Sequence, residues 1–564
     1  MSHSDTKSTA QHKSFRNDAD AFLPEALSGF IASHPDATWH DAGFIGLDSA
    51  IETQDGQPAV ALVSGGGSGH EPMHAGFLGQ GMLAAVCPGL LFTSPNAVQV
   101  TEATKWADQG RGVVHIVKNY TGDVMNFTVA RRYAEGVDTR EVLVADDVAT
   151  DKGDEDGPGR RGTGATIIVE KIAGAAAKRG DDLDAVADIA TRTAEASRSM
   201  SVALGAGFLP TTGRETFDLD PGQMEVGVGI HGEPGVDNKD IESAADIVED
   251  LLGTIIDKGS FTKGDRVICL VNGLGGATPL ELSLLFGEAN KYLAAKGITV
   301  ARSMVGTYVT SVNMHGASIT LTKVDDEMLA LFDAPTAAPA WPHTLAGTKD
   351  TKPAEVTFED RLPKGGEDNA WLTAFLERLQ PAFDELTELD RRAGDGDFGQ
   401  NMEAAFGSVQ LPLRGGDSDV LRGLAQRMLV LAGGTSGAVY GVLFNELAAG
   451  LDNGSSTGEF AAALKSAVEA IAELGGAKRG DRTVLDALIP AAERAAELDA
   501  SAPLGDSLAA IHEAAHAGAL ETRELDARKG RASYLGERSK GVADPGAIVA
   551  SWLFGGSGKV SEFN

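Results

Sequence analysis

Three glycine-rich segments of the chain each carry a histidine or an aspartate beside an apolar run. The first, Ser64-Gly-Gly-Gly-Ser-Gly-His-Glu-Pro72, follows the run AVALV and contains His70. The second contains Asp123 in the text KNYTGDVMN, and the third contains His231 in GVGIHGEPG. Glycine lets a backbone approach a small polar ligand, and histidine and aspartate bind and move protons. Together the segments predict a site for a small polar molecule, although each alone also fits a structural histidine or an aspartate cap.

Two familiar loop motifs do not fit the first segment. A dinucleotide-binding fingerprint starting at Gly65 needs glycine at the position of His70. A nucleophile elbow centred on Ser68 needs glycine at the same position. The segment is therefore predicted to be a flexible loop with His70 at its exit, or else a plain glycine-rich turn.

Three aspartates gather in the text DRRAGDGDFGQN. Asp390, Asp395 and Asp397 lie within eight positions, where their charges repel one another unless a cation is bound. A calcium loop starting at Asp395 would need glutamate eleven residues later, where the chain has Phe406. Magnesium on nucleotide phosphates needs fewer protein carboxylates. The aspartates therefore favour a magnesium site, with a solvated Asp-Gly turn as the alternative.

A second glycine cluster, Gly433-Gly-Thr-Ser-Gly437, separates the apolar runs LAQRMLVLA and AVYGVLFNELAAG. Backbone amides at a new helix N-terminus, with the hydroxyls of Thr435 and Ser436, suit a phosphate group. An ordinary hinge between two helices is the alternative. A Walker loop does not compete, because the text around Gly558 lacks the required spacing.

The charge of the chain limits its partners. The 564 residues include 48 Lys and Arg against 81 Asp and Glu, a formal charge of −33. This charge opposes nucleic acid and anionic membranes as partners, so a nucleotide substrate would need Mg²⁺ or local backbone amides. No apolar window approaches the roughly 18 residues that cross a bilayer, and the polar start carries no secretion signal. A cytoplasmic protein is expected, with Cys87 and Cys269 as reduced, buried thiols.

The elements that must position these residues fall into two classes. Between about residues 40 and 330, short β-branched runs alternate with helical stretches, the pattern of α/β layers. Residues 163–198 are predicted to be helical with a stop at Gly180. From Trp371 onwards apolar residues recur only at helical spacing. The prediction is a disordered start, an α/β domain, a linker rich in proline and charge, and an all-helical domain, over residues 1–17, 18–335, 336–366 and 367–564.

The segments resemble, nearly letter for letter, the dihydroxyacetone kinase family. Further similarity lies in GATIIVEKIAGAAA, VNGLGGATPLEL, VGTYVTS and DDEMLALFDAP, within residues 18–341. In the second half, GDRTVLDAL and GRASYLGERSKGVADPGA extend the similarity over residues 371–554. The resemblance implies a ketose-binding domain of two α/β subdomains, joined by the linker to an ATP-binding domain built as an all-α helical barrel.

The resemblance also implies roles at the matching positions. His231 would attack the ketone carbon and hold the substrate as a covalent hemiaminal, which glycerol cannot form. Asp123 would accept the proton of the attacking hydroxyl, and His70 would orient that hydroxyl. The substrate-binding residues would be Gly67, Ser68, Lys118 and His231; the nucleotide-binding residues Gly434, Thr435, Ser436, Arg538 and Asp544; and the ligands of two Mg²⁺ ions Asp390, Asp395 and Asp397.

A fused chain of this kind resembles ATP-dependent kinases of dihydroxyacetone or erythrulose. The resemblance implies a homodimer in which one chain's nucleotide domain faces the other chain's ketose domain. Residues 203–210 and 312–316 depart from the family, which usually has an acidic residue at Asn313. These changes keep both dihydroxyacetone and erythrulose open as substrates. The alternatives are a lyase that cyclises FAD and a catalytically inactive ketose-binding regulator, which the intact aspartates disfavour.

Overall fold

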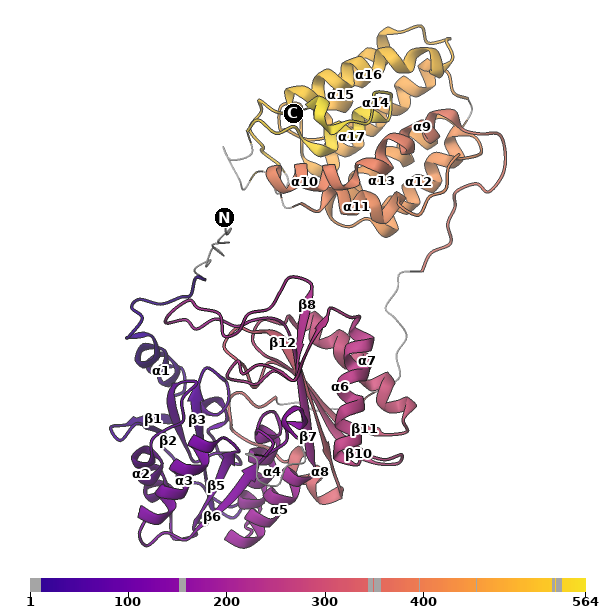
Figure 1. Ribbon diagram of the computed structural model, residues 1–564. Helices are drawn as coiled ribbons and strands as arrows, with labels where there is room; N and C mark the ends of the chain where they lie inside the picture. Colours follow the sequence, from indigo (N-terminus) through magenta and orange to yellow (C-terminus); the bar gives the residue numbers. More distant parts are fainter. Residues whose placement is uncertain are drawn as a thin grey trace, which may run out of the picture. The chain divides into compact units, whose positions relative to one another are not determined.

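The computed structural model describes residues 12–151, 159–342, 348, 357–394, 396–452, 454–529, 533 and 540–563. The chain divides into two compact units, Met1–Thr351 and Lys352–Asn564. The first unit combines strands with helices, and the second is built from helices (Figure 1). In these described ranges, no helix has both the length and the apolar character needed to cross a membrane.

A six-stranded sheet forms the first half of the α/β unit. Strands β4, β3, β5 and β6 run parallel, so their carboxyl ends share one edge. The runs that form β3 and β5 are completely buried, as expected for strands covered on both faces. The strands, in spatial order, are β1 (Ala37–His40), β2 (Phe44–Leu47), β4 (Ala85–Leu91), β3 (Ala61–Ser68), β5 (Val113–Lys118) and β6 (Thr139–Val144).

A second six-stranded sheet forms the other half of this unit. Strands β10 and β11 are parallel, and the other neighbours are antiparallel. Helices α6 (Ala244–Gly259) and α7 (Pro279–Ala295) pack together against this sheet (Figure 1). The strands, in spatial order, are β11 (Thr299–Gly306), β10 (Arg266–Gly273), β12 (His315–Lys323), β7 (Ser197–Gly205), β8 (Gln223–Val226) and β9 (Asp237–Asp240).

Helix α4 (Ala165–Arg179) contacts strands of both sheets, and α5 (Leu183–Glu195) packs beside it. Residues 165–177 are all buried, including the charged pair Glu170 and Lys171. The helix ends at Gly180, whose φ of 108° lies in the left-handed region that favours glycine. The predicted helix and its stop are confirmed, and α4 carries a carboxylate into the space between the sheets.

Two local predictions are wrong. The helix predicted to reach Arg198 ends at Glu195, and strand β7 begins at Ser197. Ser197 hydrogen-bonds Thr322 of β12, so pairing within the sheet overrides the local helical preference. The glycine-rich loop predicted after AVALV is instead the end of β3, because residues 65–68 pair with β4.

The remaining helices of the α/β unit are α1 (Phe22–Ala32), α2 (Ala97–Ala107), α3 (Thr121–Tyr133) and α8 (Asp326–Asp333). Of the segment predicted to be disordered, residues 12–17 are described, and the ring of His12 stacks on Phe208. At the start of the predicted linker, Trp341 is buried against Phe77. Cys87 and Cys269 are free and buried, as expected.

All regular elements described in the second unit are helices. Each helix from α10 to α17 contacts the next, and α17 also contacts α9 and α10, so the helices close into a ring around an apolar core. The expected helical barrel is confirmed. The helices are α9 (Ala370–Leu379), α10 (Phe383–Ala393), α11 (Phe398–Phe406), α12 (Asp417–Leu431), α13 (Gly434–Gly450), α14 (Thr457–Gly475), α15 (Leu485–Glu497), α16 (Leu504–Glu521) and α17 (Pro545–Trp552).

Candidate active site

Loops from both sheets of the α/β unit meet at the carboxyl edge of the first sheet. Strand β3 leads into His70, β4 into Phe92, and β5 into Asp123 in the first turn of α3. From the second sheet come His231, which follows β8, and Thr310, which lies between β11 and β12. Open α/β sheets bind ligands at this edge, because side chains and loops converge there.

Glycine is required where the end of β3 packs against its neighbours. A Cβ atom on Gly66 would lie 2.2 Å from Nζ of Lys118, and one on Gly67 would lie 2.7 Å from a backbone nitrogen of the loop after β4. Gly69 has a φ of 106°, and a Cβ atom there would lie 2.8 Å from the Phe92 ring. The bare backbone therefore lets a lysine and an aromatic ring approach the strand closely.

The imidazole of His231 lies among three other rings. Its centroid is 4.7 Å from that of His70, 4.6 Å from Tyr120 and 5.6 Å from Phe92, and each pair meets edge to face. The side chain of His231 is 17% exposed. The neighbouring rings hold the imidazole in place while leaving part of it accessible to a small molecule.

His70 is completely buried and has a defined tautomer. Its Nδ1 donates to the carbonyl oxygen of Thr310 at 2.8 Å, and a carbonyl can only accept, so Nδ1 carries the proton. Burial lowers the pKa of His70 well below its ordinary value, and the charges of His231 and Lys118 lower it further. His70 is therefore neutral, with the lone pair of Nε2 available as a hydrogen-bond acceptor.

Lys118 and Asp123 form a buried ion pair. Nζ of Lys118 lies 3.8 Å from Oδ2 of Asp123 and donates to the carbonyl oxygen of Gly65 at 3.0 Å. The exposed fractions of the two side chains are 0% and 3%. Burial lowers the pKa of Lys118, while the charges of Asp123 and Glu170 oppose that shift. The charge of Asp123 therefore helps to keep the lysine charged.

A histidine connects Lys118 to the central helix α4. Nε2 of His74 is 2.7 Å from Nζ of Lys118, and Nδ1 is 2.6 Å from Oε1 of Glu170. The geometry fits a lysine that donates to Nε2 and an Nδ1 proton donated to the carboxylate. Burial raises the pKa of Glu170 to about 8, although the charge of Lys118 opposes the shift. These contacts link Lys118 through His74 to Glu170 of α4 and hold the lysine in place.

Three buried polar groups at this edge of the sheet have no hydrogen-bond partner among the described residues. They are Nε2 of His70, Oδ1 of Asp123 and the hydroxyl of Tyr120. An unpaired buried polar group is costly, so a cluster of them marks a place where a ligand supplies the missing partners. Two acceptors and a hydroxyl beside an accessible imidazole suit a small molecule that carries several hydroxyls.

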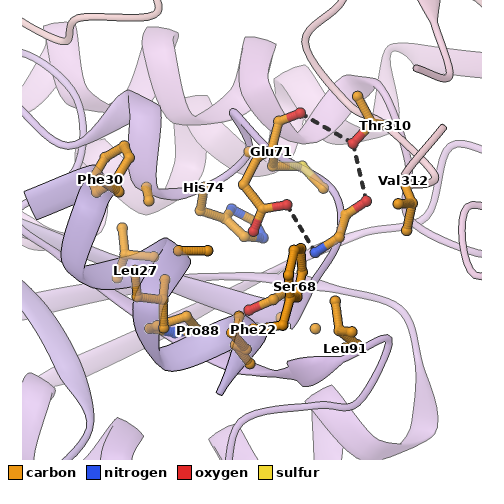
Figure 2. A pocket seen from close by; sticks show the side chains of 18 of the residues that line it. Phe22, Leu27, Phe30, Ser68, Glu71, His74, Pro88, Leu91, Thr310 and Val312 are labelled. Carbon is orange, nitrogen blue, oxygen red and sulfur yellow. Dashed lines mark hydrogen bonds between the residues drawn. The ribbon is translucent and has the colours of Figure 1, made fainter. Parts of the chain in front are cut away.

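A cavity of about 290 Å³ lies beside the same strand but does not include His231 or Asp123 in its lining. Figure 2 shows Phe22, Leu27 and Phe30 of α1 on one side of it and Ser68 on the other. Oγ of Ser68 donates to the carbonyl oxygen of Gly89 at 2.7 Å, so this predicted substrate-binding hydroxyl is engaged within the sheet. The cavity is distinct from the polar cluster around His231.

In the helical unit, two described aspartates flank the loop where α10 passes into α11, Asp390 in the last turn of α10 and Asp397 at the N-cap of α11. Oδ2 of Asp390 accepts hydrogen bonds from the backbone N–H groups of Gly396 and Phe398, at 3.0 and 3.1 Å. Burial and the nearby charge of Asp397 raise the pKa of Asp390. Oxygen donors whose like charges oppose one another fit a hard cation such as Mg²⁺. The described ranges contain no group of three or more metal-ligating side chains, and Asp395 lies outside those ranges.

The predicted phosphate cradle lies next to this loop. Helix α13 begins at Gly434, and no described side chain caps its first turn. A Cβ atom on Gly434 would lie 3.9 Å from Oδ2 of Asp397, so the helix N-terminus and the aspartate loop face each other. Thr435 is exposed and Ser436 is half-buried in that turn. Uncapped N–H groups at a helix N-terminus favour an anion.

Asp544 caps α17 and lies close to the same region. Its Oδ1 accepts a hydrogen bond of 2.7 Å from a backbone amide in the first turn. Burial raises its pKa to about 7, and the charge of Asp390 contributes to the shift. The hydroxyl of Tyr440 donates to the carbonyl oxygen of Gly546 at 2.6 Å, and its ring is 6.2 Å from Phe398 in the aspartate loop. The start of α17 is thereby tied to the aspartate loop.

The structure brings together most of the predicted site residues within each unit, but not all of them are described. Arg538, like Asp395, lies outside the described residues. Tyr120, Phe92 and Glu233 contact His231 and were missed from the sequence. Tyr120 and Glu233 lie within the glycine-rich segments identified from the sequence, so their position in the sequence could have indicated them as site residues. Phe92 follows a different strand and carries no such signal.

Comparisons with known proteins agree with this architecture. The chain matches the family models described as Dak1 domain, over residues 28–340, and DAK2 domain, over residues 392–557. The "Triokinase/FMN cyclase" of Rattus norvegicus is 35% identical, with 96% of this chain and 97% of that protein covered. The "L-erythrulose 1-kinase" of Mycolicibacterium smegmatis is 36% identical, with 95% and 97% covered. The crystal structure of the dihydroxyacetone kinase from C. freundii in complex with AMP-PNP and Mg²⁺ matches with a TM-score of 0.63 at 28% identity, covering 96% of this chain and 98% of that one.

Both domain models match in order on one chain, and the similarity to fused relatives extends over nearly its whole length. This protein therefore belongs to the dihydroxyacetone kinase family.

Proposed function

We propose that this protein transfers the terminal phosphoryl group of ATP to a primary hydroxyl of dihydroxyacetone or erythrulose. The relatives named as an L-erythrulose 1-kinase and a dihydroxyacetone kinase support an ATP-dependent ketose kinase. The observation that carries the proposal is the set of three unpartnered polar groups at the carboxyl edge of the first sheet, of which those of His70 and Tyr120 lie beside the imidazole of His231. A molecule with one carbonyl and a few hydroxyls satisfies those groups and presents a carbon that an imidazole can attack.

His231 is proposed to anchor the ketose covalently. An imidazole nitrogen forms a bond to the ketone carbon, the carbonyl π electrons move to the oxygen, and the oxygen takes up a proton to give a hemiaminal. Glycerol has no carbonyl and cannot form this adduct. The anchor would give a very small substrate a firm position and would reject plain polyols.

His70, Asp123 and Lys118 are proposed to handle the hydroxyl that attacks the phosphoryl group. The lone pair of Nε2 of His70 would accept a hydrogen bond from that hydroxyl and orient it, because Nδ1 is already used by Thr310. Oδ1 of Asp123 would accept its proton as general base. Nζ of Lys118 lies 3.8 Å from the other oxygen of the same carboxylate. Gly67 would bring its backbone close to the substrate, and Ser68 would stabilise the strand end.

The helical unit is proposed to bind ATP with two Mg²⁺ ions. Bound magnesium would neutralise the charge that develops on the transferred phosphoryl group. The nearness of Asp397 to the uncapped start of α13 supports this placement, because carboxylates alone would repel phosphates. The proposed metal ligands are Asp390, Asp395 and Asp397, and the proposed nucleotide contacts are Gly434, Thr435, Ser436, Arg538 and Asp544.

The stretches that depart from the family border the proposed ketose site. Oδ1 of Asn313 accepts a hydrogen bond of 2.8 Å from the backbone of Phe208, so the two stretches contact each other. The backbone N–H of Val312 donates to the carbonyl oxygen of Gly69 at 2.8 Å. Because these segments rest on the end of β3, their changes would alter the room for a fourth carbon. Erythrulose therefore stands beside dihydroxyacetone as a proposed substrate.

The first experiment supplies purified protein with Mg-ATP and, separately, dihydroxyacetone, D-erythrulose, L-erythrulose or glycerol, and follows ADP release. Turnover with a ketose but not with glycerol supports the proposal and ranks the substrates. Silence with every ketose overturns the kinase and leads to assays of FAD cleavage and of ketose binding without turnover.

Two variants distinguish loss of the covalent adduct from a general loss of activity. His231→Ala should abolish the preference for ketose over glycerol, because the adduct cannot form. His40→Ala is the matched control, since His40 stacks on Phe44 at the other end of the sheet, among the edge strands β1 and β2. Equal losses in both variants would contradict the role given to His231.

We further propose a homodimer in which the nucleotide domain of one chain serves the ketose domain of its partner, in the cytoplasm. Mixing His231→Ala chains with Asp390→Asn chains tests this arrangement. In exchanged dimers one composite site retains both intact halves, so activity should return on mixing. Activity that stays absent although the dimers exchange would refute the arrangement.

A further inference from the structure

The segment that carries His231 is built around the carboxylate of Glu233. Oε1 of Glu233 accepts a hydrogen bond from Nδ1 of His231 at 3.2 Å, and Oε2 accepts one from the backbone N–H of the same residue at 2.9 Å. A Cβ atom on Gly229 would lie 1.9 Å from Oε2 of Glu233, so only glycine leaves room for the carboxylate there. Both oxygens of one side chain are thus directed at one histidine.

Further charged groups keep Glu233 ionised. Arg161 approaches the same glycine, since its Nη1 would lie 2.5 Å from a Cβ atom on Gly229. The guanidinium is itself fixed by Asp147 at 2.6 Å and by the carbonyl oxygen of Gly227 at 2.8 Å. Burial disfavours the charge of Glu233, but the hydrogen bond from His231 and the charge of Arg161 act against burial, and the pKa of Glu233 is lowered to about 2. Glu233 is therefore a carboxylate at any pH at which the protein is assayed.

We propose that Glu233 is a positioning residue that holds His231 in the tautomer with the proton on Nδ1 and presents Nε2 to the ketone carbon. This inference rests on the proposed function, because it specifies which atom forms the hemiaminal. An ionised carboxylate can only accept, so the nitrogen that faces it must carry a proton. The other nitrogen then holds the lone pair that a nucleophile needs.

The same arrangement stabilises the covalent step. When Nε2 bonds to the ketone carbon and the oxygen takes up a proton, the ring becomes a cation with its proton still on Nδ1. Glu233 lies against that proton and stabilises the cation. The oxygen takes its proton from solvent water and the ring keeps its Nδ1 proton against Glu233, so a neutral imidazole, a ketone and one proton give a cationic hemiaminal paired with the carboxylate. Neither an oxidant nor a reductant is needed.

Glu233→Gln tests the inference with almost no change of shape. Glutamine has a single acceptor oxygen, but two donors face it, the backbone N–H and Nδ1–H of His231. If the oxygen serves the backbone, the amide NH₂ faces Nδ1, which must then accept, and the ring proton moves to Nε2. The variant should therefore place the proton on the nitrogen that has to attack.

Glu225→Gln is the matched control. Glu225 lies on β8, in the same hairpin, and accepts hydrogen bonds from the backbone of Gly235 at 2.6 Å and from Asn238 at 3.3 Å. The substitution removes one carboxylate from this hairpin, and the hydrogen bonds of Glu225 among the described residues go to Gly235 and Asn238 rather than to the imidazole. Glu233→Asp is a second variant, which retains the charge on a shorter side chain and should partly restore function.

Two readouts do not depend on turnover. Nitrogen-15 NMR of protein labelled at the histidine rings, with His231→Ala for assignment, reports which nitrogen of His231 lacks a proton. Carbon-13 NMR with dihydroxyacetone labelled at its carbonyl carbon reports the adduct, because that carbon loses its carbonyl shift. The third readout is the kinetic constants, with KM for the ketose separated from kcat and compared with KM for ATP.

The expected result is that Nε2 of His231 is unprotonated in the wild-type protein and in Glu225→Gln, and that Nδ1 of His231 is unprotonated in Glu233→Gln. The adduct signal should vanish in Glu233→Gln, and kcat/KM for the ketose should fall by about 100-fold or more, with KM for ATP nearly unchanged. An unaltered tautomer and adduct in Glu233→Gln, or equal losses in Glu225→Gln, would overturn the inference. If Glu233→Gln does not fold, loss of the adduct in well-folded Glu233→Asp overturns it, and a retained adduct with bare Nε2 supports it. A wild-type protein that binds no ketose would instead refute the proposed function on which the inference rests.

Discussion

Asp123→Asn isolates the proposed general base with little change of volume. The side chain of Asp123 is 3% exposed, its Oδ1 makes no hydrogen bond within the described part of the chain, and its Oδ2 lies 3.8 Å from Nζ of Lys118. Asparagine retains an oxygen at this place but accepts no proton. The substitution should therefore leave the ketose bound and slow the transfer step.

Two effects contribute to the loss, and their sizes differ. Removing a positioned base typically lowers kcat by about 10²- to 10⁴-fold. Removing a charge 3.8 Å from Lys118 also costs the lysine an attraction of about 4 kcal/mol at an effective dielectric constant of about 20. The pKa of Lys118, already lowered by burial, should then fall further. Glu170→Gln separates the two effects, because Glu170 also favours the charged lysine but reaches it only through His74.

The assay measures kcat and KM for the best ketose in both variants and records the adduct by carbon-13 NMR. Asp123→Asn should lose at least about 100-fold in kcat while the adduct persists, and Glu170→Gln should lose less than about tenfold. Two outcomes would refute the reasoning. One is an Asp123→Asn enzyme within tenfold of the wild type, and the other is a Glu170→Gln enzyme that is equally slow.

Three further predictions address other parts of the protein. Gly67→Ala should raise KM for the ketose about tenfold or more but leave KM for ATP unchanged. A Cβ atom there would lie 2.7 Å from the backbone of Thr93 and force a backbone shift that costs about 1–3 kcal/mol. Equal changes in both KM values would contradict this prediction. Asp397→Asn should raise the Mg²⁺ concentration for half-maximal velocity by about tenfold or more, and a magnesium titration with an unchanged midpoint would refute it. Burial, with the charge of Arg131, lowers the pKa of His115 from 6.5 to about 3, so below about pH 6 the unfolded form binds a proton that the folded form does not. The free energy of unfolding should therefore fall by up to about 1.4 kcal/mol per pH unit between about pH 6 and 4, and His115→Gln should reduce this slope in denaturant titrations; an equal slope in both proteins would exclude the explanation.

Much of the fold was predictable because its determinants are local. Helix α4 follows from an apolar run that ends at Gly180, and the helical unit follows from apolar spacing between Trp371 and Leu389. The first two residues of strand β7 were mistaken for helix because small, polar residues have no strong preference by themselves. Ser197 and Ser199 become part of a strand through hydrogen bonds to Thr322 and Thr320 of β12, more than a hundred residues later.

The residues of the candidate ketose site likewise fall into those that the sequence indicates and those that it does not. The spacing of glycine, histidine and aspartate after apolar runs pointed to His70, Asp123 and His231, although their roles remain predictions. Nothing local indicates Phe92, since parallel pairing of β3 with β4 brings it against His70, and its contact with His231 also needs the second sheet. Glu233 was missed for another reason. Its position two residues after His231 is visible in the sequence, but its direction towards the ring depends on the turn that Gly229 permits.

Charge bears differently on the two halves of the proposed reaction. With 81 acidic against 48 basic residues, the chain repels a nucleotide, yet Asp390 and Asp397 add carboxylates beside the helix start that is proposed to receive phosphates. Acidic residues at that position are consistent with nucleotide binding only if a divalent cation lies between the two sets of charges, so composition and motif lead separately to magnesium. An uncharged ketose does not respond to the net field. In the proposed site its recognition would depend on single atoms, such as Nε2 of His70, which is left as an acceptor because Nδ1 donates a hydrogen bond to Thr310, 240 residues along the chain. Composition therefore predicts that the nucleotide site needs magnesium, whereas the hydrogen-bonding state of single atoms in the ketose site can be derived only from the folded structure.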